Sequence, residues 1–171
     1  QPAAALEKYR KCISLQPNVF TVWENTMLIL REAANWEELY TVSEKAMEAF
    51  PNKPLSYIYH ATAATEKGRL EEALSVLQQA DLMTANNPRL RIEWADQTGA
   101  TLLRKKDYAG AVAVYEKHLT AGGDKNPIFL EHCGDALYHQ ADAAKAMQMW
   151  QKAAAIRKSP TLEQKIASGR L

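Results

Sequence analysis

Apolar side chains recur at helical spacing along the chain, in segments separated by polar turns. The segment from Thr21 to Ala33 shows the pattern clearly. Its inward positions are Val22, Trp23, Thr26, Met27 and Leu30. Intervals of three and four residues place such side chains on one face of an α-helix. The pattern therefore predicts a chain of amphipathic helices.

The same pattern predicts ten helices, separated by proline, glycine or short polar turns. They are expected at Ala3–Leu15, Thr21–Ala33, Trp36–Phe50, Leu55–Lys67, Leu70–Met83, Arg89–Arg104, Tyr108–Thr120, Ile128–Gln140, Ala143–Arg157 and Leu162–Ala167. Gly68 suits a tight turn between two helices, because glycine accepts the left-handed backbone conformation. The last helix is expected to cover the end of the fold with a polar outer face.

Equivalent residues recur at a fixed period. Pro17 and Pro51 lie 34 residues apart, as do Ala46 and Ala80. Later intervals of 38 and 35 residues keep the pattern, because the extra residues fall in turns, where insertions are tolerated. A period of this length indicates stacked helix pairs, since one pair cannot bury its apolar face alone.

The period also predicts the domain organisation. We expect one domain over residues 1–171, in which each unit is a helix pair. Its expected parts are a half repeat at 1–18, repeats near 19–52, 53–87, 88–125 and 126–158, and a capping helix at 160–169.

The fourth pair carries the clearest motif. Its first helix reads Glu131-His132-Cys133-Gly134-Asp135-Ala136-Leu137-Tyr138, and its second Lys145-Ala146-Met147-Gln148-Met149-Trp150-Gln151-Lys152-Ala153. Gly134 and Ala146 permit close helix approach, and Trp150 fills the gap. This pattern resembles the tetratricopeptide repeat (TPR). The resemblance covers nearly the whole chain, with departures at Met27, Leu39, Ser43 and His118.

The resemblance to TPR proteins implies an all-α fold. The expected architecture is a right-handed α-solenoid of about four complete repeats, with an N-terminal half repeat and a C-terminal capping helix. The last pair and the ending from Ser159 resemble the C-terminal array of a longer bacterial TPR protein. Because the chain opens at Gln1-Pro2 without Met, we expect a piece of such a protein. Expected locations are the bacterial cell envelope or periplasm, or alternatively the cytoplasm.

Composition narrows the function. The chain has 21 Lys and Arg against 20 Asp and Glu, so no general basic field favours nucleic acid. No apolar run approaches the roughly 20 residues needed to span a bilayer. The cysteines, Cys12 and Cys133, are expected to be two buried thiols in separate repeats.

Candidate chemistry is sparse. His132, Asp135 and His139 share one helix stripe, but an i to i+7 spacing of about 10 Å separates the histidines too far for one metal ion. Glu131 and Asp135 form an acidic i, i+4 pair that is expected to be solvated. The chain lacks phosphate-cradling, CxxC and HExxH motifs. We therefore expect neither an enzyme nor a cofactor or metal.

The tryptophans are expected to be mainly structural. Trp23 and Trp150 take the bulky core positions of the TPR pattern, and Trp36 takes a packed aromatic position. Trp94 is ambiguous, because Ala95 occupies the place where the pattern has a bulky residue. Either the helix shifts by one residue or Trp94 is partly exposed.

The resemblance also implies a concave groove lined by the first helix of each pair. The expected binding residues are Glu24, Leu28, Arg31, Ile58, Thr62, Thr65, Asp96, Leu103, Glu131, Asp135 and Tyr138. Acidic groups outnumber basic ones there, so we expect a neutral or basic peptide or helix of a partner protein. The lysines with which some TPR proteins hold chaperone tails are absent.

Two alternatives remain at this stage. The array could be a structural or self-associating module of a larger envelope protein. Its contact would then be the N-terminal half repeat, where Ala5, Leu6 and Tyr9 lack a preceding helix. An RNA-reading helical repeat would need a basic groove, which the stripe of binding residues argues against.

Overall fold

The computed structural model describes residues 2–15 and 17–171. Within these ranges the chain forms ten α-helices and one short 3-10 helix, and no strand. The elements are α1 (Pro2–Leu15), α2 (Phe20–Glu32), α3 (Trp36–Ala49), α4 (Pro54–Glu66), α5 (Leu70–Thr84), α6 (Pro88–Arg104), α7 (Tyr108–Leu119), η1 (Gly123–Lys125), α8 (Pro127–His139), α9 (Ala143–Ile156) and α10 (Pro160–Ser168). The predicted all-α helical repeat is confirmed, with helix bounds that agree within two residues.

The chain divides into two compact units, Gln1–Ala85 and Asn86–Leu171. Unit 1 contains α1 to α5, and unit 2 contains α6 to α10. The expectation of one continuous domain stays a prediction.

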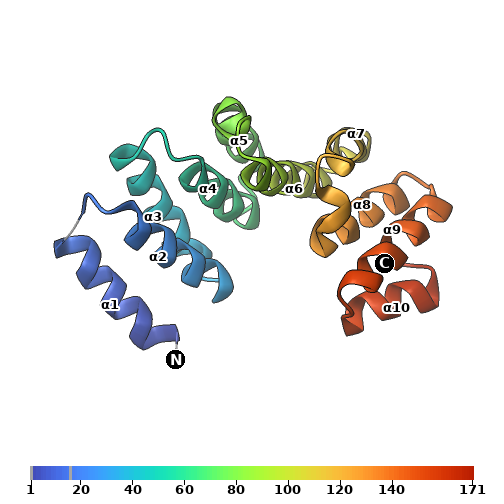
Figure 1. Cartoon of the computed structure of the whole chain (residues 1–171), viewed down its shortest axis with the longest axis horizontal. Coiled ribbons are helices and arrows are strands. Elements are labelled where there is room, and N and C mark those ends of the chain that lie inside the picture. Colours follow the sequence, from blue (N-terminus) through green and yellow to red (C-terminus); the bar gives the residue numbers. More distant parts are fainter. Residues whose placement is uncertain (1, 16) are drawn as a thin grey trace. The chain divides into compact units, whose positions relative to one another are not determined.

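In unit 1, each helix packs against the next one along the chain. α1 packs on α2, α2 on α3, α3 on α4 and α4 on α5 (Figure 1). The core that joins α2, α3 and α4 consists of Trp23, Met27, Leu30, Leu39, Ala46, Tyr59 and Ala63. Leu6 and Ile13 of α1 pack against this core from outside. The helix pairs therefore hide their apolar stripes against their neighbours, as the period predicts.

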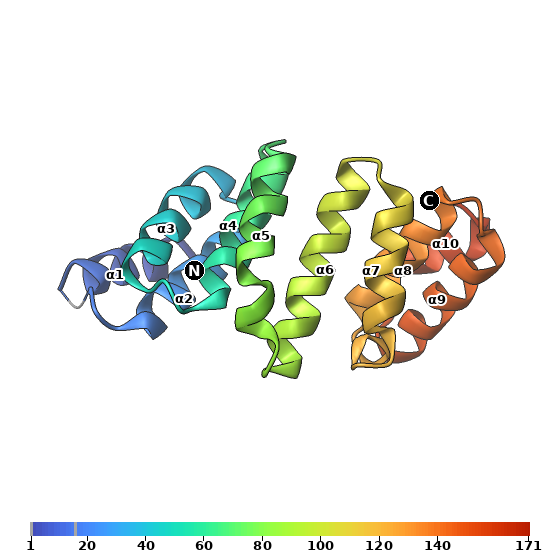
Figure 2. The same ribbon diagram turned by 90° about the horizontal axis from the view of Figure 1, so that it is seen from above.

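Unit 2 repeats this arrangement. α6 and α7 lie side by side and antiparallel in Figure 2, and α7 packs on α8, α8 on α9 and α9 on α10. The prediction that Gly134 allows close approach is confirmed, because a Cβ there would lie 2.5 Å from the Trp150 ring. Gly99 stands in the same relation to Tyr115. The expected capping helix is seated by Leu162, which is 1% exposed.

The turns inside the four helix pairs share one backbone feature. Ala34, Gly68, Lys106 and Ala141 all have a positive φ, between 52° and 76°. Each directly precedes the N-cap residue of the second helix, so one left-handed residue reverses the chain. Of the four, only Gly68 is a residue type that predicts a positive φ from the sequence. The repeat imposes the same turn on the other three, where a side chain makes the left-handed conformation strained.

Side-chain caps fix the starts of many helices. Asn35, Asp107 and Asp142 accept a backbone N–H three residues on, at the starts of α3, α7 and α9. Asn87 and Asn126 do the same for α6 and α8, where proline follows as the first helical residue. These caps explain why the helix bounds could be predicted closely.

The prediction of two buried thiols is half wrong. Cys133 is buried in the core of unit 2, and burial raises the pKa of its thiol to about 12. Cys12 is exposed on α1. Its position in the helical pattern pointed inward, but α1 packs mainly on α2, with Arg10 also paired to Glu38 of α3, so much of its surface stays open.

Candidate protein-binding surface

Within each unit, the first helices of two successive pairs are neighbours. α2 contacts α4 in unit 1, and α6 contacts α8 in unit 2. The guanidinium carbon of Arg31 lies 5.1 Å from the centre of the Tyr59 ring, which links α2 to α4. His132 Nδ1 lies 2.8 Å from Asp96 Oδ1, which links α8 to α6. Side chains of different repeats therefore share one surface in each unit.

We call these surfaces the first-helix faces. The first-helix face of unit 1 carries Glu24, Leu28, Arg31 and Thr62, and that of unit 2 carries Asp96, Leu103, Glu131, Asp135 and Tyr138. All nine side chains are partly exposed.

Two predicted binding residues are not on the surface. Ile58 is 1% exposed and Thr65 is 3% exposed. The Thr65 hydroxyl donates to the carbonyl oxygen of Ala61 on its own helix at 2.7 Å. Thr62, the third predicted binding residue of α4, is partly exposed, and its hydroxyl donates to the Ile58 carbonyl at 2.9 Å. The α4 part of the face is therefore narrower than the sequence predicts.

The acidic groups of the unit 2 face have partners inside the chain. Lys165 Nζ on α10 donates to Glu131 Oε1 at 2.9 Å and to Asp135 Oδ2 at 2.8 Å. Trp150 Nε1 also donates to Asp135 Oδ1, at 2.9 Å. The Lys165 side chain is only 12% exposed. Although burial acts to lower the pKa of Lys165, hydrogen bonds with Asp135 and Glu131 raise it overall.

The expectation that Glu131 and Asp135 form a solvated pair is wrong. Both carboxylates are less than one fifth exposed, and they share the ammonium group of Lys165. This cation offsets one of the two negative charges. The capping helix α10 is therefore held on unit 2 by the ion pairs of Lys165 as well as by the buried Leu162.

Asp96 is also paired, with His132. Burial acts to lower the pKa of His132, but the charge of Asp96 and its hydrogen bond raise it overall above the ordinary 6.5. Asp135 and Glu131 add to the rise. The imidazole is thereby held toward its charged form beside three carboxylates, so it offsets a further part of the negative charge of the unit 2 face.

We expect unit 2 to lose stability as the pH rises from about 6 to 8. A raised pKa in the folded state stabilises it below the unfolded pKa, and this gain is lost as the pH passes through the folded value. Urea unfolding followed by circular dichroism at several pH values measures the slope. In His132→Gln the slope should flatten, and an unchanged slope in this variant would exclude the His132–Asp96 pair as its source.

His132 and His139, which share one helix stripe in the sequence, have different partners in the structure. His139 stacks on Tyr108, with ring centres 4.6 Å apart and planes 8° apart, while His132 is turned toward Asp96. No group of three metal-binding side chains gathers anywhere in the described ranges. The centre of the Tyr138 ring lies 6.2 Å from that of His139 and 5.8 Å from that of Trp150. The C-terminal end of α8 therefore takes part in aromatic packing.

Of the two alternatives for Trp94, the structure shows partial exposure and no shift of the helix by one residue. Ala95 is fully buried and takes the core position, while Trp94 packs against its margin. The Arg91 guanidinium lies 4.4 Å from the centre of the Trp94 ring, and His118 meets its edge. Trp94 is thus held by a cation and an imidazole.

The self-association alternative rests mostly on side chains outside those the structure describes, namely Ala5 and Tyr9. The third, Leu6, is partly buried against the unit 1 core. Among helices of the described ranges, none has the length and apolar character required to cross a bilayer.

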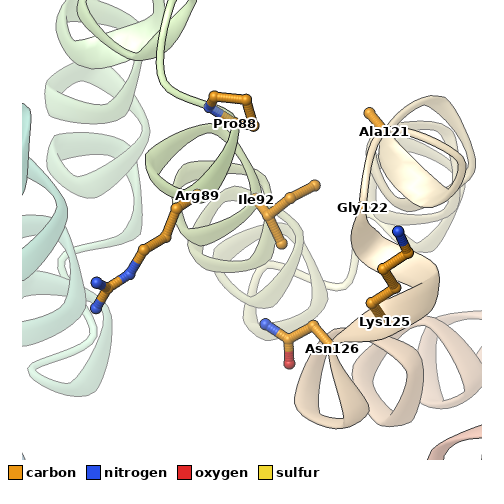
Figure 3. A pocket seen from close by; sticks show the side chains of 7 residues that line it. All are labelled: Pro88, Arg89, Ile92, Ala121, Gly122, Lys125 and Asn126. Atoms are coloured by element: carbon orange, nitrogen blue, oxygen red, sulfur yellow. The ribbon is translucent and has the colours of Figure 1, made fainter.

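Sequence reasoning missed a hollow at one edge of unit 2. Its volume is about 270 Å³, and it lies between the start of α6 and the connection from α7 to α8 (Figure 3). It is lined by Pro88, Arg89, Ile92, Ala121, Gly122, Lys125 and Asn126. The one sequence feature that could have indicated this hollow is the insertion at residues 121–125, which lengthens the connection from α7 to α8 and contains Lys125.

No family model matches the sequence. No curated protein matches it either.

Solved structures do match. A thermophilic TPR protein of Thermus thermophilus is similar with a TM-score of 0.81 and 18% identity, over 98% of this chain and 90% of that one. MamA from residue 41 onward, of Desulfovibrio magneticus, gives a TM-score of 0.68 and 14% identity, over 93% and 87%. A chain of the APC/C hetero-tetramer Cut9–Hcn1 gives 0.81 and 12%, over 99% of this chain and 33% of that one. The chain therefore has the TPR fold.

Proposed function

We propose that this chain is a non-enzymatic scaffold that binds a segment of a partner protein on its first-helix faces. The observation that carries the proposal is the direct contact of α2 with α4 and of α6 with α8. It supports the proposal because both neighbouring helices carry partly exposed side chains. An extended peptide or a helix could contact several of them at once. The shared fold supports this, and the similar Cut9–Hcn1 chain belongs to a hetero-tetramer.

The sequence left a neutral or a basic segment open, and the internal ion pairs favour the neutral one. In unit 2, Lys165 and His132 offset two of the three carboxylate charges of the face. In unit 1, Glu24 and Arg31 have opposite charges. Leu28, Leu103 and Tyr138 remain partly exposed as apolar contacts. Recognition is then mainly apolar, with polar groups setting the register.

One arrangement in unit 1 has the residue types of a hydrolase triad. Ser43 Oγ lies 3.1 Å from His60 Nδ1, and His60 Nε2 lies 3.1 Å from Glu72 Oε1. Yet Ser43 is fully buried, and its hydroxyl is 2.6 Å from the Leu39 carbonyl to which it donates. A nucleophile must reach a substrate. The arrangement therefore supports a structural link between α3, α4 and α5.

Selection of peptides from a random library displayed on phage, with the purified chain as bait, tests the proposal. We expect one or a few related sequences to be enriched and to bind the chain in fluorescence anisotropy. Leu28→Asp and Leu103→Asp, combined, should weaken these peptides by at least about fivefold, because they place carboxylates in an apolar contact.

Leu82→Asp is the matched control. Leu82 is 86% exposed on α5, a second helix, and lies outside both faces. It should leave binding unchanged. Failure to enrich any peptide, or an equal loss in the Leu82 variant, would contradict the proposed function. Circular dichroism of each variant checks that the fold is retained.

A further inference from the structure

The hollow at the edge of unit 2 combines an apolar floor with unpaired positive charge. Pro88, Ile92 and Ala121 supply the apolar surface, and Ile92 is only 7% exposed. Arg89 and Lys125 are exposed, and neither forms an ion pair within the described part of the chain. No carboxylate lines the hollow, since Asp124, next to Lys125, is exposed and lies outside the lining.

The polar groups of the hollow are donors. The Asn126 side-chain oxygen is occupied, because it accepts the backbone N–H groups of Ile128 and Phe129 at 3.0 and 3.2 Å. These bonds fix the amide, and Figure 3 shows its nitrogen on the side that faces α6. The start of α6 adds the positive end of a 17-residue helix. A ligand here meets donors and cations without a competing carboxylate.

In Figure 3, Lys125 lies across the hollow from Ile92, and the Arg89 guanidinium lies beyond the floor, on the other side of α6. They are thus placed to meet two separate carboxylates better than a single one. The volume, about 270 Å³, lies just below the range of about 300 to 1,000 Å³ that is typical of small-molecule sites. It fits one side chain with its flanking groups.

We infer that this hollow anchors an acidic segment of a partner protein, with an aliphatic side chain on Ile92 and carboxylates on either side toward Arg89 and Lys125. The occupant is an acidic peptide, because charge complementarity selects carboxylates and the apolar floor adds a contact that a bare anion cannot make. This inference rests on the proposed function, and it adds a site for an acidic segment at the edge of unit 2 to the first-helix faces.

The test uses the full chain and a fluorescein-labelled peptide, Gly-Glu-Glu-Leu-Glu-Glu-Gly. Two matched peptides carry Gly in place of Leu, or Lys in place of Glu. We expect the acidic leucine peptide to bind more tightly than either, and its affinity to fall with added salt. Arg89→Glu combined with Lys125→Glu should weaken it by about tenfold or more, because both rim charges are reversed.

The matched control is Lys117→Glu combined with Lys152→Glu. Both lysines are exposed, on α7 and α9, and lie outside the hollow, so this variant changes the net charge equally. Ala121→Asp, which adds a carboxylate to the lining, should also weaken the peptide. Backbone amide shifts in NMR should change near Ile92 and Gly122 when the acidic peptide is added.

The outcomes separate this inference from the proposed function. Absence of binding by the acidic peptide, or an equal loss in both charge-reversed variants, would overturn the anchor. If peptides from the phage selection then still bind the first-helix faces, the scaffold function stands without it. If neither those peptides nor the acidic one binds, both proposals fail.

Discussion

Replacement of Trp150 by alanine should destabilise unit 2 by about 3 to 5 kcal/mol, the cost of deleting a fully buried aromatic side chain. Trp150 has no exposed surface. Its ring fills the gap opened by Gly134, and its Nε1 donates to Asp135. Alanine would leave a cavity between α8 and α9 and remove a donor from a poorly exposed carboxylate. Urea unfolding followed by circular dichroism measures the change.

Trp150→Phe separates the ring from its hydrogen bond. Phenylalanine keeps most of the packing and loses the donor, so we expect a smaller cost of about 1 to 2 kcal/mol. If Trp150→Ala cost less than the phenylalanine variant, the close packing of α8 on α9 would be contradicted.

Replacement of Lys165 by methionine should cost about 2 to 4 kcal/mol, because it leaves Glu131 and Asp135 without their cation. Methionine keeps the length of the side chain, so the loss reports on charge more than on packing. The Lys165 side chain is 12% exposed, and the two carboxylates are 18% and 19% exposed. Solvent can compensate them only in part. The midpoint of urea unfolding measures the effect.

Two further variants check the cause. Lys152→Met removes an exposed lysine from α9 and should change stability by less than about 0.5 kcal/mol. Glu131→Gln and Asp135→Asn, added to Lys165→Met, should restore part of the loss because no uncompensated carboxylate remains. An undiminished loss in the triple variant would show that packing, not charge, holds α10.

The sequence predicted the fold well because its main signals are local. Pro54, Pro88 and Pro127 start helices, and Asn and Asp caps follow many turns, so helix bounds could be read from neighbouring residues. The spacing of small residues predicted close packing, and Ala46 and Ala80 are indeed fully buried. The left-handed turns at Ala34, Lys106 and Ala141 could not be predicted, since those residue types rarely adopt a positive φ.

The candidate site was harder to predict because its properties depend on distant pairs. Lys165 lies 34 residues from Glu131 in the sequence, and His132 lies 36 residues from Asp96. Counting charges along one helix stripe showed the acidic groups and missed the cations that pair with them from other helices. Ile58 and Thr65 show the same limit, since both fit the expected stripe and both are buried.

The most direct test of the scaffold function maps where a selected peptide binds. Amide hydrogen exchange or NMR shifts of the whole chain, measured with and without a phage-selected peptide, would report on every helix at once. We expect the largest changes on the first helices of a unit, α2 with α4 or α6 with α8. Changes concentrated on the second helices α3, α5, α7 and α9 would contradict binding at the first-helix faces.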